Sequence, residues 1–217
     1  MVFSDEVMKN KDWLKGSGSS DTFTLNPHKL LGVPLQCSML LTPHKGHLLF
    51  AKANSLQAEY LFHDNPYDLG AGTIGCGRRP DATKVFLAWK FYGKEGLGDR
   101  VDRALQITDQ FTDIVRQRKG FVLVQDPSSF LQICFWFVPS AIQKVNDEIL
   151  SKITKELHKR VNLTGEFLVD RSPLIGVPDF FRVVVNAPTV SLHRDLERLL
   201  DLIEEEASTV DWNLVLS

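Results

Sequence analysis

The feature that most constrains the fold is a stripe of apolar and small residues within residues 97–115. Its members recur at spacings of three and four, as one face of an α-helix does, and the intervening positions are mostly charged or polar. They are Leu97, Val101, Ala104, Leu105, Thr108, Phe111, Thr112 and Val115. We therefore predict a long connecting helix over residues 96–118 with one face packed against other elements.

A small α+β domain is predicted after this helix, over residues 119–217. Apolar runs at residues 121–125, 131–138 and 180–185 predict three strands. One helix carries the stripe Val145, Ile149, Ile153 and Leu157, and the last helix carries Leu192, Leu196, Leu199, Leu200 and Ile203. The order strand, strand, helix, strand, helix is typical of α+β domains.

The part before the connecting helix is irregular and rich in Gly, Pro and His. Short strands are predicted at residues 23–25 and 36–41, and a compact helix at residues 81–92. Asp81 suits the start of that helix and Gly93 its end. We expect this part to belong to a larger structure.

Charge and composition exclude several classes of function. The chain has 217 residues, 25 basic and 27 acidic, which argues against a nucleic-acid surface. Its apolar runs are shorter than the roughly 20 residues of a membrane span. Cys37, Cys76 and Cys134 are odd in number and widely spaced, as expected of reduced thiols. The expectation is a cytoplasmic protein without membrane or nucleic-acid partners.

Lys29 is the candidate nucleophile. It ends the run Asn26-Pro27-His28-Lys29, where Pro27 fixes the backbone so that the amine projects from a rigid elbow. Such a lysine can form a Schiff base once desolvation favours its neutral form. A solvated loop lysine is the alternative. His28 is either a ligand for an anionic group or a capping histidine.

Two further residues stand out from their surroundings. Arg182 interrupts the apolar run 180–185, where a guanidinium needs an anionic partner. That partner is either a substrate carboxylate or a structural one, for instance Asp179. Tyr60 lies in a polar stretch, residues 54–67, that predicts a loop, so its phenol is either functional or packed on the surface.

Several motifs together resemble one family. The lysine run with Gln36-Cys37-Ser38 is similar to the lysine motif of group II pyridoxal-phosphate decarboxylases, in the glutamate and cysteine-sulfinate branch. Further similarities follow in the family's order, from about residue 3 to about residue 207. They include Tyr60-Leu61-Phe62, Cys76-Gly77-Arg78-Arg79, Trp89-Lys90, Cys134-Phe135-Trp136-Phe137 and Phe180-Phe181-Arg182.

The resemblance implies an α/β fold, part of a fold-type I transferase dependent on pyridoxal 5'-phosphate. Residues 1–95 would form the end of its large domain, followed by the connecting helix and the small C-terminal domain. Lys29 would hold the cofactor as a Schiff base, with His28 on its phosphate. Tyr60 would return a proton to the substrate carbon, and Arg182 would bind the substrate carboxylate.

The implied function is decarboxylation of an acidic amino acid, namely glutamate, aspartate or cysteine sulfinate, in an enzyme that is a homodimer. Only 28 residues precede Lys29, and the aspartate that holds the cofactor ring nitrogen would precede them. We therefore expect the chain to represent the C-terminal half of the enzyme. A truncated, non-catalytic homologue that associates with a full-length subunit is one alternative, and an aromatic amino-acid decarboxylase is another.

Two motifs are set aside on their context. Gly70, Gly72 and Gly75 have the spacing of a dinucleotide-binding loop, but no apolar strand precedes them. His44 and His47 flank a turn with no third ligand nearby in the sequence. We therefore expect neither dinucleotide nor metal binding.

Overall fold

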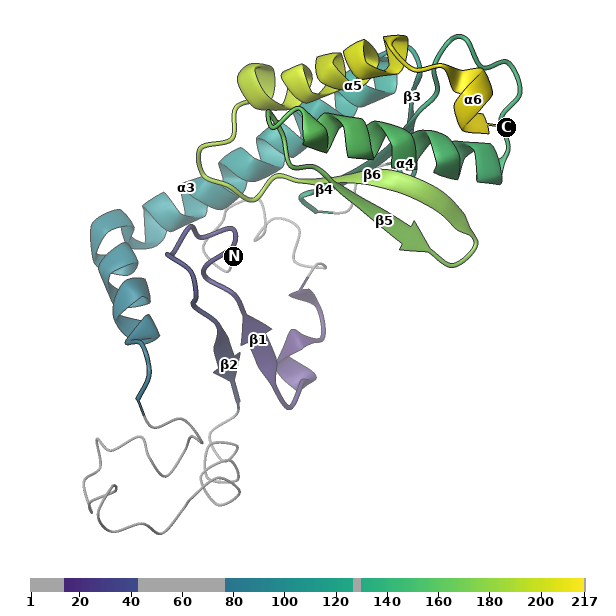
Figure 1. Ribbon diagram of the computed structural model, residues 1–217. Coiled ribbons are helices and arrows are strands. Elements are labelled where there is room, and N and C mark those ends of the chain that lie inside the picture. The colour runs from purple at the N-terminus through teal and green to yellow at the C-terminus, as the bar shows by residue number, and fades with distance from the viewer. Residues whose placement is uncertain (1–13, 43–76, 127–129, 217) are drawn as a thin grey trace, which may run out of the picture. The chain divides into compact units, whose positions relative to one another are not determined.

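The computed structural model describes residues 14–42, 77–126 and 130–216 (Figure 1). These residues fall into two compact units, Met1–Arg100 and Val101–Ser217, and each unit is described by itself. The division falls inside helix α3, Asp81–Gln117. Among the described residues, no helix combines the length and the apolar character that crossing a membrane requires.

Unit 1 is built on a pair of short antiparallel strands. β1, Phe23–Leu25, pairs with β2, Met39–Leu41, so that Leu25 lies opposite Met39, and a short 3-10 turn, Ser17–Ser19, precedes them. The first strand has the predicted bounds, whereas the second begins three residues later than predicted. Residues before β2 instead contact the lysine run through side chains, as Ser38 Oγ does by donating to Asn26 Oδ1 at 2.7 Å.

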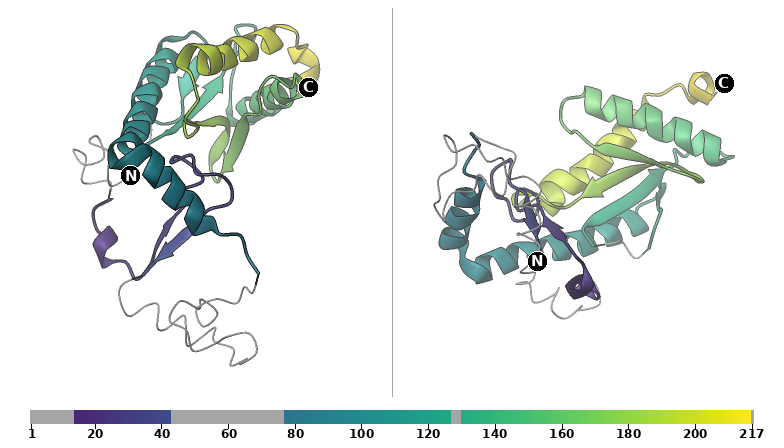
Figure 2. Two further views of the ribbon diagram at one scale, coloured as in Figure 1. Left: turned by 90° about the vertical axis from the view of Figure 1, so that its left-hand side faces the viewer. Right: turned by 90° about the horizontal axis from the view of Figure 1, so that it is seen from below.

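Helix α3 changes direction at Gly93, which Figure 2 shows as a bend. Gly93 has φ 64° and ψ −175°, a conformation that glycine adopts without a Cβ penalty. The break occurs where the first of the two predicted helices ends. Beyond it, all eight residues of the predicted stripe are buried, which confirms the helix and the face that it packs inward.

Unit 2 contains a four-stranded antiparallel sheet in the order β3-β4-β6-β5. Its strands are β3 Phe121–Leu123, β4 Gln132–Phe137, β5 Asp170–Leu174 and β6 Val177–Val184. Strands β3, β4 and β6 correspond to predicted strands, but β5 was not predicted. Its sequence Asp-Arg-Ser-Pro-Leu lacks an apolar alternation, and its place at the sheet edge tolerates the proline.

One face of the sheet carries the core of unit 2. Phe135 of β4 lies against Phe111 of α3 and stacks on Phe181 of β6, with ring centroids 6.4 and 5.5 Å apart. Helices α4, Asp147–Leu163, and α5, Arg198–Ser208, cover the sheet in Figure 1, and α4 packs directly on β6. The burial of these apolar side chains is the main driving force for folding this unit.

The ends of the helices follow local signals. Asn146 caps α4, accepting from the Ile149 N–H at 2.8 Å, so the helix begins after the predicted stripe residue Val145. A π-helical turn, Leu192–Glu197, leads into α5, and a short helix α6, Trp212–Leu216, follows it.

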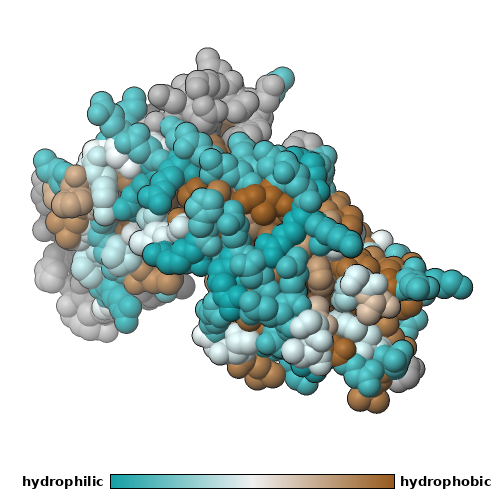
Figure 3. All heavy atoms as spheres, turned by 90° about the horizontal axis from the view of Figure 1, so that it is seen from above, coloured by the Kyte–Doolittle hydropathy of each residue, from teal (hydrophilic) through white to brown (hydrophobic). Residues whose placement is uncertain are grey.

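Figure 3 shows mainly hydrophilic side chains on the described surface seen from above, with apolar ones between them.

Candidate active site

Lys29 lies at the tip of a turn fixed by backbone hydrogen bonds. Its N–H donates to Asn26 O at 3.0 Å, and its carbonyl accepts from Gly32 N–H at 2.9 Å. The N–H of buried Val33 donates to the carbonyl of Pro27 at 3.1 Å. The backbone is thus anchored on both sides of the lysine while the lysine itself is exposed. The predicted turn is therefore present, and the role of Lys29 as a nucleophile stays a prediction.

His28 joins the two halves of the lysine motif. Its Nδ1 lies 2.5 Å from Cys37 O and 3.2 Å from Cys37 N. Cys37 is buried, its Sγ lies 3.6 Å from Asp81 O, and burial raises the pKa of its thiol. The His28 ring therefore makes a local structural contact, as expected of the alternative of a capping histidine. Nε2 is not part of this contact.

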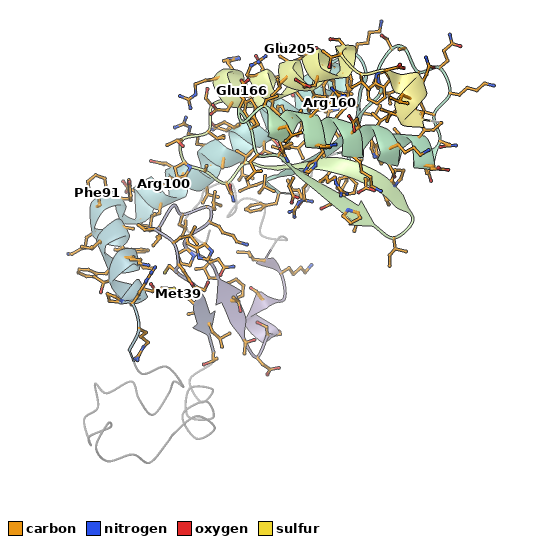
Figure 4. All side chains as sticks on the ribbon, in the orientation of Figure 1. Met39, Phe91, Arg100, Arg160, Glu166 and Glu205 are labelled. Carbon is orange, nitrogen blue, oxygen red and sulfur yellow. The ribbon has the colours of Figure 1, made fainter. Side chains whose placement is uncertain are left out.

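Two cations of α3 hold the segment that follows the lysine. Lys84 Nζ donates to the carbonyl oxygens of Leu35 and Gln36 at 3.3 and 3.0 Å and to Asp81 Oδ1 at 2.7 Å. Arg100, labelled in Figure 4, donates through Nη1 to Leu31 O at 2.8 Å. These anchoring roles were not predicted from the sequence, because they depend on contacts between residues about 50 to 70 positions apart.

Arg182 lies on β6, opposite Asp170 of β5 and Cys134 of β4. Its Nε and Nη2 both donate to Asp170 Oδ2, and this bond lowers the pKa of the Asp170 carboxyl. Asp179 was suggested as a structural partner of Arg182, and this suggestion was wrong. Asp179 instead pairs with Arg171 and with Lys155 Nζ, the latter at 3.2 Å. Strand alternation turns Asp179 away from Arg182, because the two are an odd number of residues apart.

The predicted site residues are distributed over the two units. Lys29 and His28 belong to unit 1, and Arg182 belongs to unit 2. Tyr60, Cys76, the pair His44 and His47 and the glycines of the loop motif lie outside the described residues. Within the described part of the chain, no cluster of His, Cys, Asp and Glu could hold a metal ion.

The chain is similar to known decarboxylases over most of its length. Residues 3–138 match the pyridoxal-dependent decarboxylase conserved domain. The acidic amino acid decarboxylase GADL1 of Mus musculus is 35% identical over 206 residues, which cover 90% of this chain and 37% of that protein. The cysteine sulfinic acid decarboxylase of Mus musculus is 34% identical over 201 residues, covering 88% of this chain and 40% of the relative.

The fold agrees with these similarities. The crystal structure of mouse CSAD superimposes with a TM-score of 0.81 and 32% identity, over 94% of this chain and 43% of that one. The predicted fold class, part of a fold-type I enzyme, is thereby confirmed. The chain spans 37 to 40% of the length of the curated relatives named above. On the match over residues 3–138, the chain belongs to the pyridoxal-dependent decarboxylase family.

Proposed function

We propose that this chain carries the cofactor-linking lysine and the carboxylate-binding arginine of a decarboxylase for acidic amino acids. The observation that carries the proposal is the position of Lys29. Its amine is presented at the exposed tip of a turn that backbone bonds, Lys84 and Arg100 hold in place. A fixed backbone beneath a reactive side chain lowers the entropy cost of holding reacting groups in register.

The residues of this turn fit pyridoxal 5'-phosphate. Lys29 Nζ is the amine that would hold the cofactor covalently. In the tautomer whose Nδ1 accepts from the Cys37 N–H, His28 would donate from Nε2 to the cofactor phosphate. Imidazole bound at one nitrogen presents the other in a defined direction. When bound, the cofactor accepts the electron pair that remains on the substrate when carbon dioxide leaves.

We assign substrate binding to Arg182 and proton delivery to Tyr60. A guanidinium binds a carboxylate through two parallel N–H donors, so Arg182 suits glutamate, aspartate or cysteine sulfinate. Tyr60 would deliver a proton from Oη to the substrate carbon after decarboxylation. The acidic branch is preferred over the aromatic one because Leu30 follows the lysine, where the aromatic branch carries an aromatic residue. The two relatives named above also act on acidic substrates.

We further propose that the protein is a cytoplasmic homodimer. Cys37 and Cys134, the described cysteines, are free thiols, as is usual in the reducing cytosol. Large apolar side chains on the first segment of α3, Phe86, Leu87 and Phe91, are exposed, as expected of a surface that a second subunit covers. The alternative of a non-catalytic homologue that associates with a full-length subunit predicts the same surface without turnover.

Covalent capture of the cofactor tests the lysine assignment. We expect the purified chain, incubated with pyridoxal phosphate and reduced with borohydride, to carry the adduct on Lys29, as located by peptide mass spectrometry. Lys29→Ala should lose it, whereas Lys90→Ala, at another exposed lysine of unit 1, should keep it. An adduct spread evenly over the lysines would contradict the assignment.

Release of carbon dioxide tests the reaction. Glutamate, aspartate and cysteine sulfinate are each supplied to the cofactor-loaded protein. Turnover of one of them, lost in Lys29→Ala, would support the proposed decarboxylation. A cofactor held at Lys29 without release from any of the three is expected both of a non-catalytic homologue and of a C-terminal half assayed alone, so turnover is the decisive result.

A further inference from the structure

Arg182 already pairs with a carboxylate of the chain itself. The pair uses the edge of the guanidinium that would bind a substrate carboxylate. Asp170 faces it directly across the β5–β6 ladder, and one oxygen, Oδ2, accepts from both Nε and Nη2. These are two adjacent donors of the guanidinium, the geometry through which arginine takes up a carboxylate. The side chains of Arg182 and Asp170 are 39% and 56% exposed, so solvent and small solutes reach the pair.

Asp170 is held in place independently of the arginine. Its other oxygen, Oδ1, accepts from the backbone N–H of Arg171 at 2.9 Å, and the paired strand fixes its backbone. In this arrangement Asp170 binds Arg182 through one oxygen only. A free carboxylate can give two, one to each N–H, which is the stronger arrangement. An incoming carboxylate can thus replace Asp170 on the guanidinium while Asp170 stays bonded to Arg171.

A cavity gives a small acid access to the pair. Asp170 and Arg182 both line a hollow of about 280 Å³, whose other walls include the apolar side chains of Val184, Val190 and Leu196. This volume exceeds that of a five-carbon diacid, and the apolar wall suits its methylene groups. A second carboxylate, Asp195, lines the cavity but is bound by Arg194 and by the N–H of Ser191.

We propose that Asp170 is a specificity-determining residue that competes with carboxylate ligands for Arg182. It weakens the capture of acidic substrates, because an incoming carboxylate must displace Asp170 from the guanidinium. The inference rests on the proposed function in taking Arg182 as the substrate-binding arginine. Because the competition needs only the chain and a carboxylate, it can be measured without cofactor or turnover.

Binding of glutarate, a diacid without an amine, provides the test. Titration of the chain of residues 1–217, followed by NMR at the backbone amides of Arg171 and Arg182, gives the Kd. We expect Asp170→Asn to lower the Kd about two- to fivefold, the range that corresponds to an exposed ion pair. Asp170→Glu keeps the competing anion and should leave the Kd close to that of the parent.

Two further variants make the result specific. Glu166→Gln removes a carboxylate from another exposed arginine pair, Glu166–Arg198, and changes the net charge equally, so it should leave the Kd unchanged. Glu166 is labelled in Figure 4. Asp170→Asn combined with Arg182→Gln should lose the gain. An unchanged Kd in Asp170→Asn, or an equal gain in Glu166→Gln, would overturn the inference.

The outcomes separate this inference from the proposed function. Glutarate that binds through Arg182 with no effect of Asp170→Asn would overturn the competition alone. Absence of glutarate binding in the parent and in Asp170→Asn would also overturn it, because Arg182 would then not take a carboxylate. Failure of cofactor capture at Lys29 would overturn the decarboxylase proposal and leave the glutarate result standing.

Discussion

His158 shows how one partly buried contact ties folding to pH. It lies on α4, where its Nε2 is 3.1 Å from Asn162 Nδ2, so the neutral ring accepts a hydrogen bond there. Partial burial and the positive charge of Arg171 lower the pKa of His158, although a hydrogen bond with the backbone of Val169 and the charge of Asp170 oppose this shift. The folded protein therefore takes up a proton at His158 less readily than the unfolded chain does.

The expected result is a loss of stability on mild acidification. The unfolded histidine titrates at about pH 6.5, and the folded one below that, so the unfolded state binds more protons between the two values. Stability contributed by the neutral ring is present above about pH 6.5 and falls as the pH drops below it. Urea unfolding between about pH 7.5 and 5 should show a smaller decline for His158→Gln, whose amide oxygen can still accept from Asn162.

His193 supplies the control for this prediction. It is exposed and its Nδ1 contacts Glu197 at 3.0 Å, so His193→Gln also removes one histidine but not a partly buried ring that accepts from Asn162. The prediction is wrong if the parent and His158→Gln lose stability equally with falling pH, or if His193→Gln flattens the profile as much as His158→Gln does.

Candidate functional residues could be identified from the sequence more easily than the side chains that they contact. Lys29 and Arg182 stand out because a lysine behind Pro27 and an arginine in an apolar run are unusual in their surroundings. Asp179, the example of a structural partner suggested for Arg182, was wrong because this nearest carboxylate in sequence points the other way. Asp170 became a neighbour only through β5, a strand that the sequence did not reveal.

At the scale of elements, the turn between α3 and β3 depends on a glycine. Gly120 has φ 87°, and its carbonyl accepts from the Val138 N–H at 2.8 Å, which joins the turn to the end of β4. A Cβ at this position would lie 2.9 Å from Phe137 Cε2 and 3.1 Å from Val138 O. Both the backbone conformation and the space therefore require glycine.

Gly120→Ala should consequently destabilise unit 2 strongly. The left-handed conformation costs a Cβ-bearing residue roughly 1 to 2 kcal/mol, and the overlap with β4 adds about 1 to 3 kcal/mol. The matched control is Gly176→Ala in the β5–β6 turn, where φ is 77° but no atom lies within 4 Å of the added Cβ. Denaturant unfolding should show a loss for Gly120→Ala that clearly exceeds that of the control. Equal losses would mean that the contact with Phe137 is relieved without cost.

The elements themselves were predictable where their periodicity is strong. The stripe of α3 and the apolar strands β4 and β6 were recognised because burial on one face imposes a period of 3.6 or 2. β5 and α6 were missed because the first is a polar edge strand and the second is a single short turn after Ala207. The bend at Gly93 followed from the glycine, whose conformational freedom is independent of tertiary packing.

At the scale of the whole molecule, the described residues of the two units differ in how far they bury their aromatic side chains. Unit 2 encloses a continuous aromatic core around Phe135. In unit 1, by contrast, the first segment of α3 exposes Phe86, Leu87 and Phe91, which are 58%, 60% and 80% accessible. Figure 4 shows Phe91 projecting outward from the helix. Exposed aromatic groups of this size on one segment indicate a surface that associates.

We therefore expect the chain to self-associate through this segment of α3. Each large apolar side chain that an interface buries contributes roughly 1.5 to 3 kcal/mol, so replacing two of them should weaken association by about tenfold or more. The double variant Leu87→Gln and Phe91→Gln keeps good helix formers at both positions. Sedimentation equilibrium over a range of concentrations should show oligomers for the parent and mainly monomer for this variant. Leu163→Gln, which removes an exposed leucine at the end of α4, is the control and should associate as the parent does. A parent that stays monomeric at high concentration, or a double variant that associates equally, would show that other surfaces or none join the subunits.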